Sequence, residues 1–199
     1  MRLRTGIALA RVRASRNVFD EGSMLHVGFN GRKLRFKVPD DDLLRESLYN
    51  EVREQFIENQ YGRLNVRNRK VVDIGGGCAD TAIYFVARGA LHVYSYEPDK
   101  PSYENGKANI RLNGMGKKIT FVNSRYGGAK MRAKGTVLKM DCEGCEYEYL
   151  RDFIGYDELI LEFHANPNEL VRMLANSGYK VEVAGTLLYA KRWRALPTL

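Results

Sequence analysis

The 199-residue sequence predicts an α/β protein, a three-layer sandwich with a mostly parallel, seven-stranded sheet that ends in an antiparallel hairpin. From Lys70 onward, short apolar segments of strand length alternate with segments of helical periodicity, and glycines separate them. Such alternation is typical of a parallel sheet covered by helices on both faces. We therefore expect residues 70–199 to form one domain, with residues 1–69 packed on it as an N-terminal extension.

The N-terminal extension is expected to hold a basic arm, a β-hairpin and a helix. Met24–Val38 alternates apolar and polar residues around Asn30-Gly31, which is a strong signal for a two-residue hairpin turn. The acidic cluster Asp40–Asp42 then favours a helix start, because carboxylates stabilise the N-terminal end of the helix dipole. Apolar residues at helical spacing between Leu44 and Phe56 continue this helix, which should end near Tyr61-Gly62.

The elements of the main domain follow from apolar runs and the residues that stop them. Pro101 favours a helix start, whereas Gly89 and Gly178 favour helix ends. The expected strands are 71–74, 91–96, 119–123, 136–140, 159–163, 181–183 and 187–191, and the expected helices are 79–88, 101–113, 147–153 and 168–177. The Gly-rich connection at 124–135 is compatible with either a loop or a hairpin.

Composition excludes some classes of protein and leaves others open. The sequence is 44% hydrophobic and 28% charged, as in ordinary globular domains, and no apolar run approaches the roughly 20 residues needed to span a bilayer. The segment Met1–Arg16 lacks the continuous apolar core of a secretory signal. The net charge of +8 favours nucleic acid or another anionic partner, but solubility explains it equally well. The oligomeric state cannot be inferred.

The cysteines favour a reducing, cytoplasmic location. Cys78, Cys142 and Cys145 cannot all pair internally, and their spacing differs from that of small disulfide-rich secreted proteins. Cys142 and Cys145 have C-x-x-C spacing, but no second pair completes a four-ligand zinc site. We interpret the three as small buried residues and keep a redox role as the alternative.

A glycine-rich turn after the first parallel strand predicts a nucleotide site. Asp73 is followed by Ile74 and then by Gly75, Gly76 and Gly77, which allow a tight turn and a close backbone approach to a ligand. A nicotinamide fingerprint would require a glycine where Asp80 stands, and no phosphate-binding loop follows. A carboxylate there would repel a pyrophosphate but tolerates a cofactor that carries sulfonium and ammonium groups.

The next two strand ends extend this candidate site. Glu97-Pro98 ends the second strand 24 positions after Asp73, where a carboxylate can accept hydrogen bonds from the two ribose hydroxyls in a Rossmann-like fold. Asn123-Ser124 ends the third strand and is a candidate contact for an adenine ring. Asn and Ser are also ordinary turn formers, so this second assignment has a purely structural alternative.

These segments resemble class I S-adenosylmethionine-dependent methyltransferases. The matching segments are Val71–Gly77, Tyr96–Pro98, Asn109–Asn113, Leu138–Glu146 and Leu161–His164. The run Lys139-Met140-Asp141-Cys142-Glu143-Gly144-Cys145-Glu146 resembles the Lys-x-Asp-x-Glu-Gly-x-Glu motif of the FkbM-type family, and Leu161–His164 resembles its Glu-x-His strand end. The resemblance implies S-adenosylmethionine (SAM) as methyl donor and O-methylation of sugars or natural products. One departure is Ala79, which replaces the third glycine of the first loop.

The candidate catalytic residues lie at the ends of the fourth and fifth strands. They are Asp141, Glu143, Glu162 and His164. Residues two apart on a strand share a face, so the pairs Asp141/Glu143 and Glu162/His164 can point into one cleft. Asp141 is a candidate for cofactor contact as well. A hydroxyl acceptor must lose a proton, for which His164 is a suitable base, oriented or replaced by Glu143 or Glu162.

Other interpretations of these residues remain open. Glu143 and Glu146 would be stabilised at a helix start in any case, and His164 has a structural alternative as a hydrogen-bonded core residue. The carboxylates and His164 could instead hold a divalent cation, although no metal ligand is assigned.

The sequence therefore predicts a SAM-dependent methyltransferase that acts on a hydroxyl of a sugar, glycan or other small molecule. An RNA methyltransferase that acts on a ribose or on a base is the first alternative because of the basic charge. However, the fourth strand end, Asp141-Cys142-Glu143-Gly144, lacks the Pro-Pro-aromatic segment on which a flipped base stacks. The second alternative is a SAM-binding module without catalytic activity.

Overall fold

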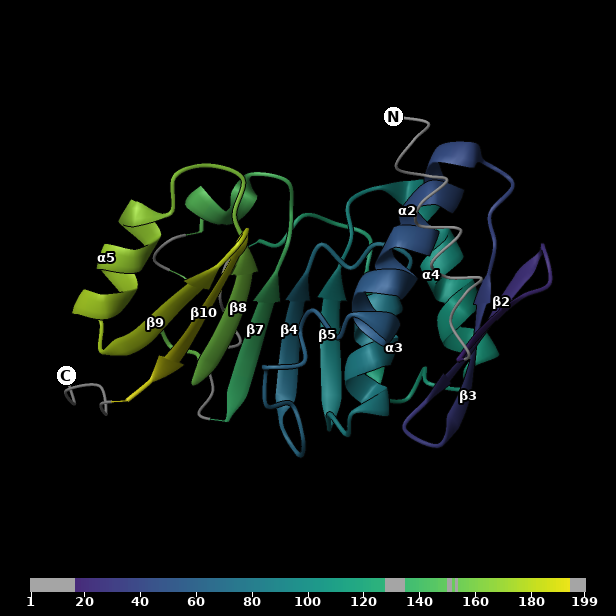
Figure 1. Ribbon diagram of the computed structural model, residues 1–199, viewed down its shortest axis with the longest axis horizontal. Helices are drawn as coiled ribbons and strands as arrows, with labels where there is room; N and C mark the ends of the chain where they lie inside the picture. The colour runs from purple at the N-terminus through teal and green to yellow at the C-terminus, as the bar shows by residue number, and fades with distance from the viewer. Residues whose placement is uncertain (1–16, 128–134, 150–151, 153, 194–199) are drawn as a thin grey trace.

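A computed structural model describes residues 17–127, 135–149, 152 and 154–193. The candidate basic arm at the N-terminus therefore lies outside the described residues, as does most of the 124–135 connection. The main body is a seven-stranded sheet with helices on both faces, and a small three-stranded sheet lies beside helix α4 at one end (Figure 1). The predicted fold class is confirmed.

The elements follow the predicted order. The strands are β1 (Val18–Asp20), β2 (Met24–Phe29), β3 (Arg32–Lys37), β4 (Lys70–Ile74), β5 (His92–Tyr96), β6 (Ile119–Val122), β7 (Thr136–Met140), β8 (Glu158–Glu162), β9 (Tyr179–Ala184) and β10 (Leu187–Arg192). The α-helices are α2 (Asp42–Val52), α3 (Asp80–Ala87), α4 (Lys100–Leu112) and α5 (Asn168–Asn176). A π-helix, η1 (Arg53–Ile57), extends α2, and a 3₁₀-helix, η2 (Cys145–Tyr147), follows β7.

The large sheet has the order β6-β5-β4-β7-β8-β10-β9, in which β4 to β8 pair in parallel and β10 runs antiparallel to both neighbours. The chain goes from β4 to one side for β5 and β6, and then to the other side for β7 and β8. The strand order thus switches at β4, the place where open α/β sheets bind ligands. In register, Ile74 lies between Tyr96 and Met140, so Gly75, Glu97 and Asp141 leave the sheet at the same edge.

The core consists of two buried clusters, one on each face of this sheet. Val71, Val93 and Val137 belong to the cluster under α3, whereas Val72 and Leu138 belong to the cluster under α5. Successive residues of a strand point to opposite faces, which explains why continuous apolar strands serve both clusters. The first cluster also includes buried residues of the small sheet and of α2, so the N-terminal segment and the main sheet share one core.

The small sheet is attached to the main body through α4. Its predicted hairpin is present, and Asn30 and Gly31 both have positive φ, of 49° and 73°. Asn109 of α4 and Asn113, which caps the C-terminal end of this helix, accept hydrogen bonds from the backbone N–H groups of Lys37 and Arg35, at 2.7 Å and 2.9 Å. These side chains satisfy the outer edge of β3. Strand β1, which pairs with β2, was not predicted.

One predicted helix differs from the structure. Of the helix expected at 147–153, the structure shows the 3₁₀-helix η2 ending at Tyr147, and residues 150, 151 and 153 lie outside the description. The left-handed backbone of Glu143 and Gly144 just before it, with φ of 54° and 105°, keeps the chain in a tight turn. Within the described part of the chain, no helix is long and apolar enough to cross a membrane.

Candidate functional site

The glycine turn after β4 is fixed by its contact with the end of β7. Gly75 has a φ of 76°, and a Cβ placed there would lie 1.6 Å from the carbonyl oxygen of Asp141. The N–H groups of Gly75 and Gly76 both donate to the carbonyl of Tyr96, each at 3.0 Å. The turn therefore requires glycine at position 75, and it joins the ends of three strands.

Asp73 does not line the candidate site, contrary to the sequence prediction. Its side chain is fully buried and accepts hydrogen bonds from Thr81 and Ser95 at 2.8 Å and 2.7 Å. Its other oxygen lies 3.3 Å from Nζ of the equally buried Lys139. Because β4 and β7 are neighbours and both positions face inward, the carboxylate forms an ion pair beneath the turn instead of reaching a ligand.

Lys139 links this buried pair to the glycine turn. Its ammonium group also donates to the carbonyl of Gly75. Burial by itself would lower the pKa of Lys139, but the negative charges of Asp73, Asp141 and Asp80 raise it. The side chain thus stays charged and holds the backbone of the turn in place.

Asp80 is also absent from the cavity wall. It is the first residue of α3 and is 1% exposed, beside Glu51 of α2. Burial raises its pKa well above the ordinary value, and the charge of Glu51 and a hydrogen bond with it act in the same direction. Burial and the neighbouring Glu51 thus disfavour the charged form of Asp80, which lies outside the cavity wall where the sequence analysis had expected a carboxylate beside the cofactor.

The residues Gly76, Gly77 and Ala79 shape the turn without lining the cavity. A Cβ at Gly76 would meet Ser95 Oγ at 2.2 Å, and Gly77 has a φ of 48°. Ala79, where the resemblance implies glycine, has a φ of 62°. A non-glycine residue in this conformation costs about 1 kcal/mol or more, so the alanine keeps the loop geometry at some expense in stability.

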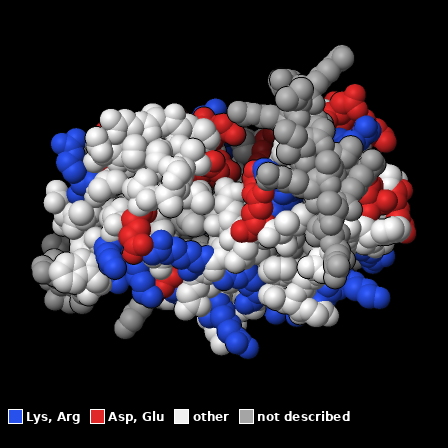
Figure 2. All heavy atoms as spheres, viewed as in Figure 1, with Lys and Arg blue, Asp and Glu red and all other residues white. Residues whose placement is uncertain are grey.

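A cavity of about 420 Å³ opens at the carboxyl ends of β4, β5 and β7. Its lining residues are Ile74, Gly75, Tyr96, Glu97, Pro98, Arg125, Tyr126, Asp141, Cys142, Glu143, Gly144, Cys145, Glu148 and Tyr149. Figure 2 shows Asp and Glu side chains on both sides of a hollow in the upper middle of the molecule, above these strand ends, whereas Lys and Arg gather along the lower part. The cavity thus combines carboxylates with aromatic rings.

Glu97 and Pro98 lie in the cavity wall, where the sequence predicted them. Glu97 is 8% exposed, and its two oxygens accept hydrogen bonds from the N–H groups of Gly77 at 2.9 Å and Asp99 at 2.7 Å. Burial raises its pKa, while these two hydrogen bonds lower it. A carboxylate that is fixed by backbone donors at the mouth of a glycine turn can still accept hydrogen bonds from a ligand through its remaining lone pairs.

Asn123 and Ser124 do not line the cavity. The amide of Asn123 donates to the carbonyls of Glu97 and Pro98, at 2.9 Å and 3.1 Å, and thereby ties the loops after β5 and β6 together. Ser124 donates its backbone N–H to Val122 in a tight turn. The turn-forming alternative is the one that the geometry favours. The wall is instead supplied by Tyr126, whose ring contacts Tyr96 edge to face at a centroid distance of 5.3 Å.

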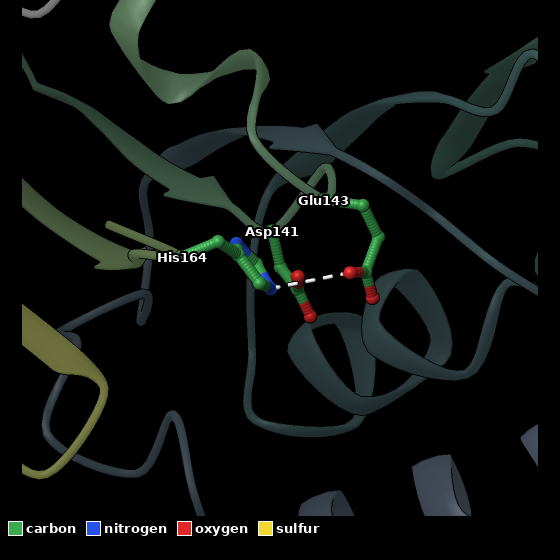
Figure 3. A group of neighbouring side chains, drawn as sticks. All are labelled: Asp141, Glu143 and His164. Carbon is green, nitrogen blue, oxygen red and sulfur yellow. Dashed lines mark ion pairs between the residues drawn. The ribbon is translucent and has the colours of Figure 1, made fainter.

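Asp141, Glu143 and His164 come together at one side of the cavity. One potential ligand atom from each lies within 4.8 Å of the other two. The Nε2 atom of His164 is 3.3 Å from a carboxylate oxygen of Glu143, and in the view of Figure 3 the carboxylate of Asp141 lies between them. The hydroxyl of Tyr61 donates to Asp141 at 3.3 Å.

Glu146 holds His164 from behind, a contact that the sequence analysis missed. Glu146 is fully buried, and its Oε1 lies 2.9 Å from the backbone nitrogen and 3.1 Å from Nδ1 of His164. Its other oxygen accepts from the N–H of Gly144 at 2.9 Å. Partial burial lowers the pKa of His164, but the hydrogen bond with Glu146 and the charges of Glu143, Glu146 and Asp141 raise it overall.

Glu162 does not join this group, although it was paired with His164 in the sequence analysis. Strand β8 ends at Glu162, so the alternation of side chains no longer applies two residues later. Its oxygens accept hydrogen bonds from Thr186 at 3.0 Å and Gln60 at 3.1 Å. Burial and the charge of Asp141 raise the pKa of Glu162. The nearby Glu54 has a pKa raised to about 7, mainly by burial.

Cys142 and Cys145 form a disulfide in the cavity wall, which corrects the interpretation of these two residues as simple buried cysteines. Cys78 is buried and unpaired, as expected. The disulfide closes the turn that carries Glu143 and Gly144. It also removes the cysteine-based argument for a reducing compartment, so the cytoplasmic location stays a prediction.

The sequence analysis missed the roles of Lys139, Glu146 and Tyr126 for different reasons. Lys139 and Glu146 belong to the motif quoted for the fourth strand end, but Lys139 received no role, and Glu146 was considered only as a helix start. Tyr126 lies in a Gly-rich segment without periodic pattern. Lys139 within a buried strand was the one available signal, because a buried lysine requires a carboxylate partner.

The chain resembles two viral proteins whose names carry no function. It is 25% identical over 120 residues to "Uncharacterized protein 65" of Sulfolobus islandicus filamentous virus, covering 58% of this chain and 74% of that protein. It is 26% identical over 131 residues to "Uncharacterized protein 158B" of Sulfolobus islandicus rod-shaped virus 1, covering 59% and 76%. No family model matches the sequence, and the FkbM-type resemblance stays a prediction.

Solved methyltransferase structures share the fold. Magnesium protoporphyrin IX methyltransferase from Synechocystis PCC 6803, with bound S-adenosylhomocysteine (SAH), has a TM-score of 0.57 at 15% identity, covering 77% of this chain and 89% of that one. Precorrin-6y C5,15-methyltransferase from Geobacter metallireducens has a TM-score of 0.55 at 16% identity, covering 68% and 86%. Sp1610 of Streptococcus pneumoniae, a candidate tRNA (m1A22) methyltransferase in complex with SAM, has a TM-score of 0.54 at 18% identity, covering 70% and 73%. The chain therefore has the fold of class I SAM-dependent methyltransferases.

Proposed function

We propose that this protein is a SAM-dependent methyltransferase that methylates a hydroxyl oxygen of a sugar, glycan or other small molecule. One observation carries the proposal: Glu97 and Asp141 line the same cavity as the glycine turn, at the switch point of the sheet. The fold alone supports many functions, so the argument rests on these side chains and on their surroundings.

The residues in the cavity wall fit SAM. Glu97 would accept hydrogen bonds from the two ribose hydroxyls. Tyr96 and Tyr126 offer aromatic surfaces beside it for the adenine ring, and Gly75 leaves room for the backbone to approach the ligand. Asp141 would face the positive charge of the methionine portion. The sulfonium of bound SAM supplies an activated methyl group.

The acceptor would lie beside Asp141, Glu143 and His164. In methyl transfer the acceptor oxygen forms a bond to the methyl carbon while the carbon–sulfur bond breaks, so its alignment with the sulfur accounts for much of the rate. Carboxylates at this place accept hydrogen bonds from hydroxyl groups, which favours a polyhydroxylated acceptor. The hydroxyl also loses its proton. We infer that Nε2 of His164 accepts this proton, because Nδ1 is occupied by Glu146.

Calorimetry with SAM tests the cofactor assignment. We expect Glu97→Ala to weaken binding about 100-fold or more, because two hydrogen bonds to a charged group contribute about 1.5–3 kcal/mol each. Glu104→Ala is the matched control, since Glu104 is an exposed carboxylate on α4 that pairs with Lys107. Unchanged SAM affinity in Glu97→Ala would contradict the ribose assignment.

Transfer of labelled methyl groups to a panel of polyols, sugars and glycans tests the acceptor class. His164→Ala should lower turnover while leaving SAM affinity within about twofold, because His164 does not line the cofactor cavity. If no acceptor of this class is methylated although SAM binds, the proposed acceptor class fails.

RNA is a second candidate acceptor, favoured by a basic groove. An open groove of about 590 Å³ between β3 and α4 is lined by Arg35, Lys37 and Arg111, and the whole chain has a net charge of +8. The carboxylates at the cavity would repel a phosphate backbone, so RNA ranks second. Filter binding at increasing salt distinguishes the two, because phosphate-driven affinity falls steeply with salt.

A further inference from the structure

The group Asp141, Glu143 and His164 has a composition that methyl transfer by itself does not require. The three side chains come from the end of β7, from the following turn and from the segment after β8 (Figure 3). They offer one imidazole nitrogen and two carboxylates to a common point. Asp141 is half-buried, whereas Glu143 and His164 are accessible, so an ion could reach this point from solvent.

The imidazole is held in the orientation that a metal ligand needs. The Nδ1 atom of His164 faces the fully buried carboxylate of Glu146, which has no proton to donate when ionised and therefore accepts the Nδ1–H bond. In the neutral His164 ring, the free lone pair is then on Nε2, and this atom points toward Glu143. A histidine that binds a metal nearly always donates its other N–H to such a carboxylate or to a carbonyl.

The spacing of the three side chains also suits a shared cation. Ligand atoms at about 2.0–2.2 Å from one ion lie about 3–4 Å from each other. The distance from Nε2 of His164 to the Glu143 oxygen is 3.3 Å, and all three ligand atoms lie within 4.8 Å of one another. Because Glu143 is exposed, its side chain is free to turn toward an ion at this point.

Apart from His164 itself, no basic side chain of the described residues forms an ion pair with Asp141 or Glu143. Asp141 receives the Tyr61 hydroxyl, and Lys139 is directed beneath the turn toward Asp73 and Gly75. Glu162 adds a further negative charge near Asp141. The negative charge of these side chains therefore favours a bound cation. Asp141 has two carboxylate oxygens, so one can contact this cation while the other faces the sulfonium of SAM.

We propose that Asp141, Glu143 and His164 together bind one divalent transition-metal cation such as Mn²⁺, and that His164 contributes its Nε2 atom. A mixed nitrogen and oxygen set with three protein ligands favours Mn²⁺, Co²⁺ or Zn²⁺ over Mg²⁺ or Ca²⁺, which prefer oxygen alone. The remaining positions are open to water or to an acceptor oxygen. Because a cation-bound Nε2 has no lone pair left to accept a proton, the cation would replace His164 in activating the acceptor hydroxyl. This role of the cation rests on the proposed function, but the binding site itself does not.

Titration of the full chain with Mn²⁺, in the absence of SAM, tests the site by calorimetry and by electron paramagnetic resonance. We expect one Mn²⁺ per chain. Glu143→Gln and His164→Ala should each weaken binding at least tenfold, and Glu146→Gln should weaken it about 10- to 100-fold by freeing the ring. Glu143 is exposed, so its variant is expected to fold normally even if Glu146→Gln does not.

Glu148→Gln is the matched control, because Glu148 is an exposed carboxylate in the same cavity wall but outside the group. It should change Mn²⁺ affinity less than twofold. An equal loss in Glu148→Gln and Glu143→Gln would show diffuse attraction to acidic residues and would overturn the proposal, as would the absence of stoichiometric binding. Mn²⁺ binding without SAM binding would refute the proposed function alone, whereas full methyl transfer in the presence of a chelator would refute only the role of the cation.

Discussion

The two sides of the candidate site are built differently. On the cofactor side, around the ends of β4, β5 and β7, the polar groups are buried and have partners within the protein: Asp73, Lys139 and Glu97 are 0%, 1% and 8% exposed. On the acceptor side, the side chains of the catalytic candidates are accessible, with Glu143 at 87% and His164 at 32% side-chain exposure. Glu146 and Tyr61, which contact His164 and Asp141, are buried behind them.

This difference suggests that the cofactor side contributes to the stability of the fold, whereas the acceptor side can vary with the substrate. Buried charges are costly unless they are paired, so the cofactor side cannot change one residue without disturbing the fold. Exposed residues on a turn contribute little to stability and can change with the substrate. Mutations on the cofactor side should therefore reduce stability as well as cofactor binding, whereas mutations on the acceptor side should change ligand binding with little effect on stability.

The largest effect is expected for Lys139→Met on the cofactor side. This change leaves Asp73 as an unpaired buried carboxylate and should reduce the free energy of unfolding by about 3–5 kcal/mol. Urea denaturation measures it. Lys107→Met, which removes an exposed pair with Glu104, should cost about 1 kcal/mol or less. Similar losses in the two variants would remove the structural distinction between the sides.

A methyl group at the glycine turn should have the next largest effect. Gly75→Ala places a Cβ against the carbonyl of Asp141 in a positive-φ conformation, which we expect to cost about 2–4 kcal/mol and to abolish SAM binding. Gly116→Ala, where a Cβ would meet no atom within 4 Å, is the control for thermal unfolding. A Gly75→Ala chain with normal stability would show that the turn can move away from β7.

Glu54, beside the acceptor side, should make stability depend on pH. Its pKa is about 7 in the folded chain, mainly because of burial, against an ordinary value of 4.5. The stabilisation by its proton is therefore complete below about pH 4.5 and is lost as the pH rises through 7. In a metal-free buffer, Glu54→Gln should be more stable than the unmodified chain at pH 8, by about 1 kcal/mol after allowance for partial exposure.

Thermal unfolding of both chains between pH 5 and pH 8 measures this contribution. The other carboxylates titrate in both chains, so the difference between the two curves isolates Glu54. A difference that does not change across this range would contradict the raised pKa.

The smallest effect on stability is expected for Glu143→Gln on the acceptor side. Its carboxylate is exposed and its pairing with His164 is accessible to water, so the free energy of unfolding should change by less than about 0.5 kcal/mol. Urea denaturation in the absence of divalent cations measures it. A loss above about 1 kcal/mol would mean that the turn depends on this carboxylate, and the contrast between the two sides would be weaker.

The sequence predicted the elements well because their signals are local. The Asn30-Gly31 turn, the helix that starts after Asp41 and the alternation from β4 to β8 depend on residues only a few positions apart. Glu97 and Asp141 were placed correctly at the cavity for a related reason. Both directly follow strands, and the ends of neighbouring parallel strands lie at one edge of the sheet.

Partner choice was not predictable from the sequence. Asp73 and Asp141 look alike as strand-final carboxylates, yet one is the buried partner of Lys139 and the other lines the cavity. Likewise, the sequence analysis paired Glu162 with His164, but in the structure Glu146 contacts His164 and Glu162 contacts Thr186. The reason is that β8 ends before His164 and the chain turns toward η2.

By itself, then, the sequence determined the order of strands and helices, the glycine turn and the set of carboxylates near it, since these follow from neighbours along the chain. Only the tertiary structure decided which carboxylates are buried in ion pairs, which cysteines form a disulfide and which residues surround His164. Those outcomes depend on residues brought together from distant parts of the chain, and burial gives each such contact its effect on charge and stability.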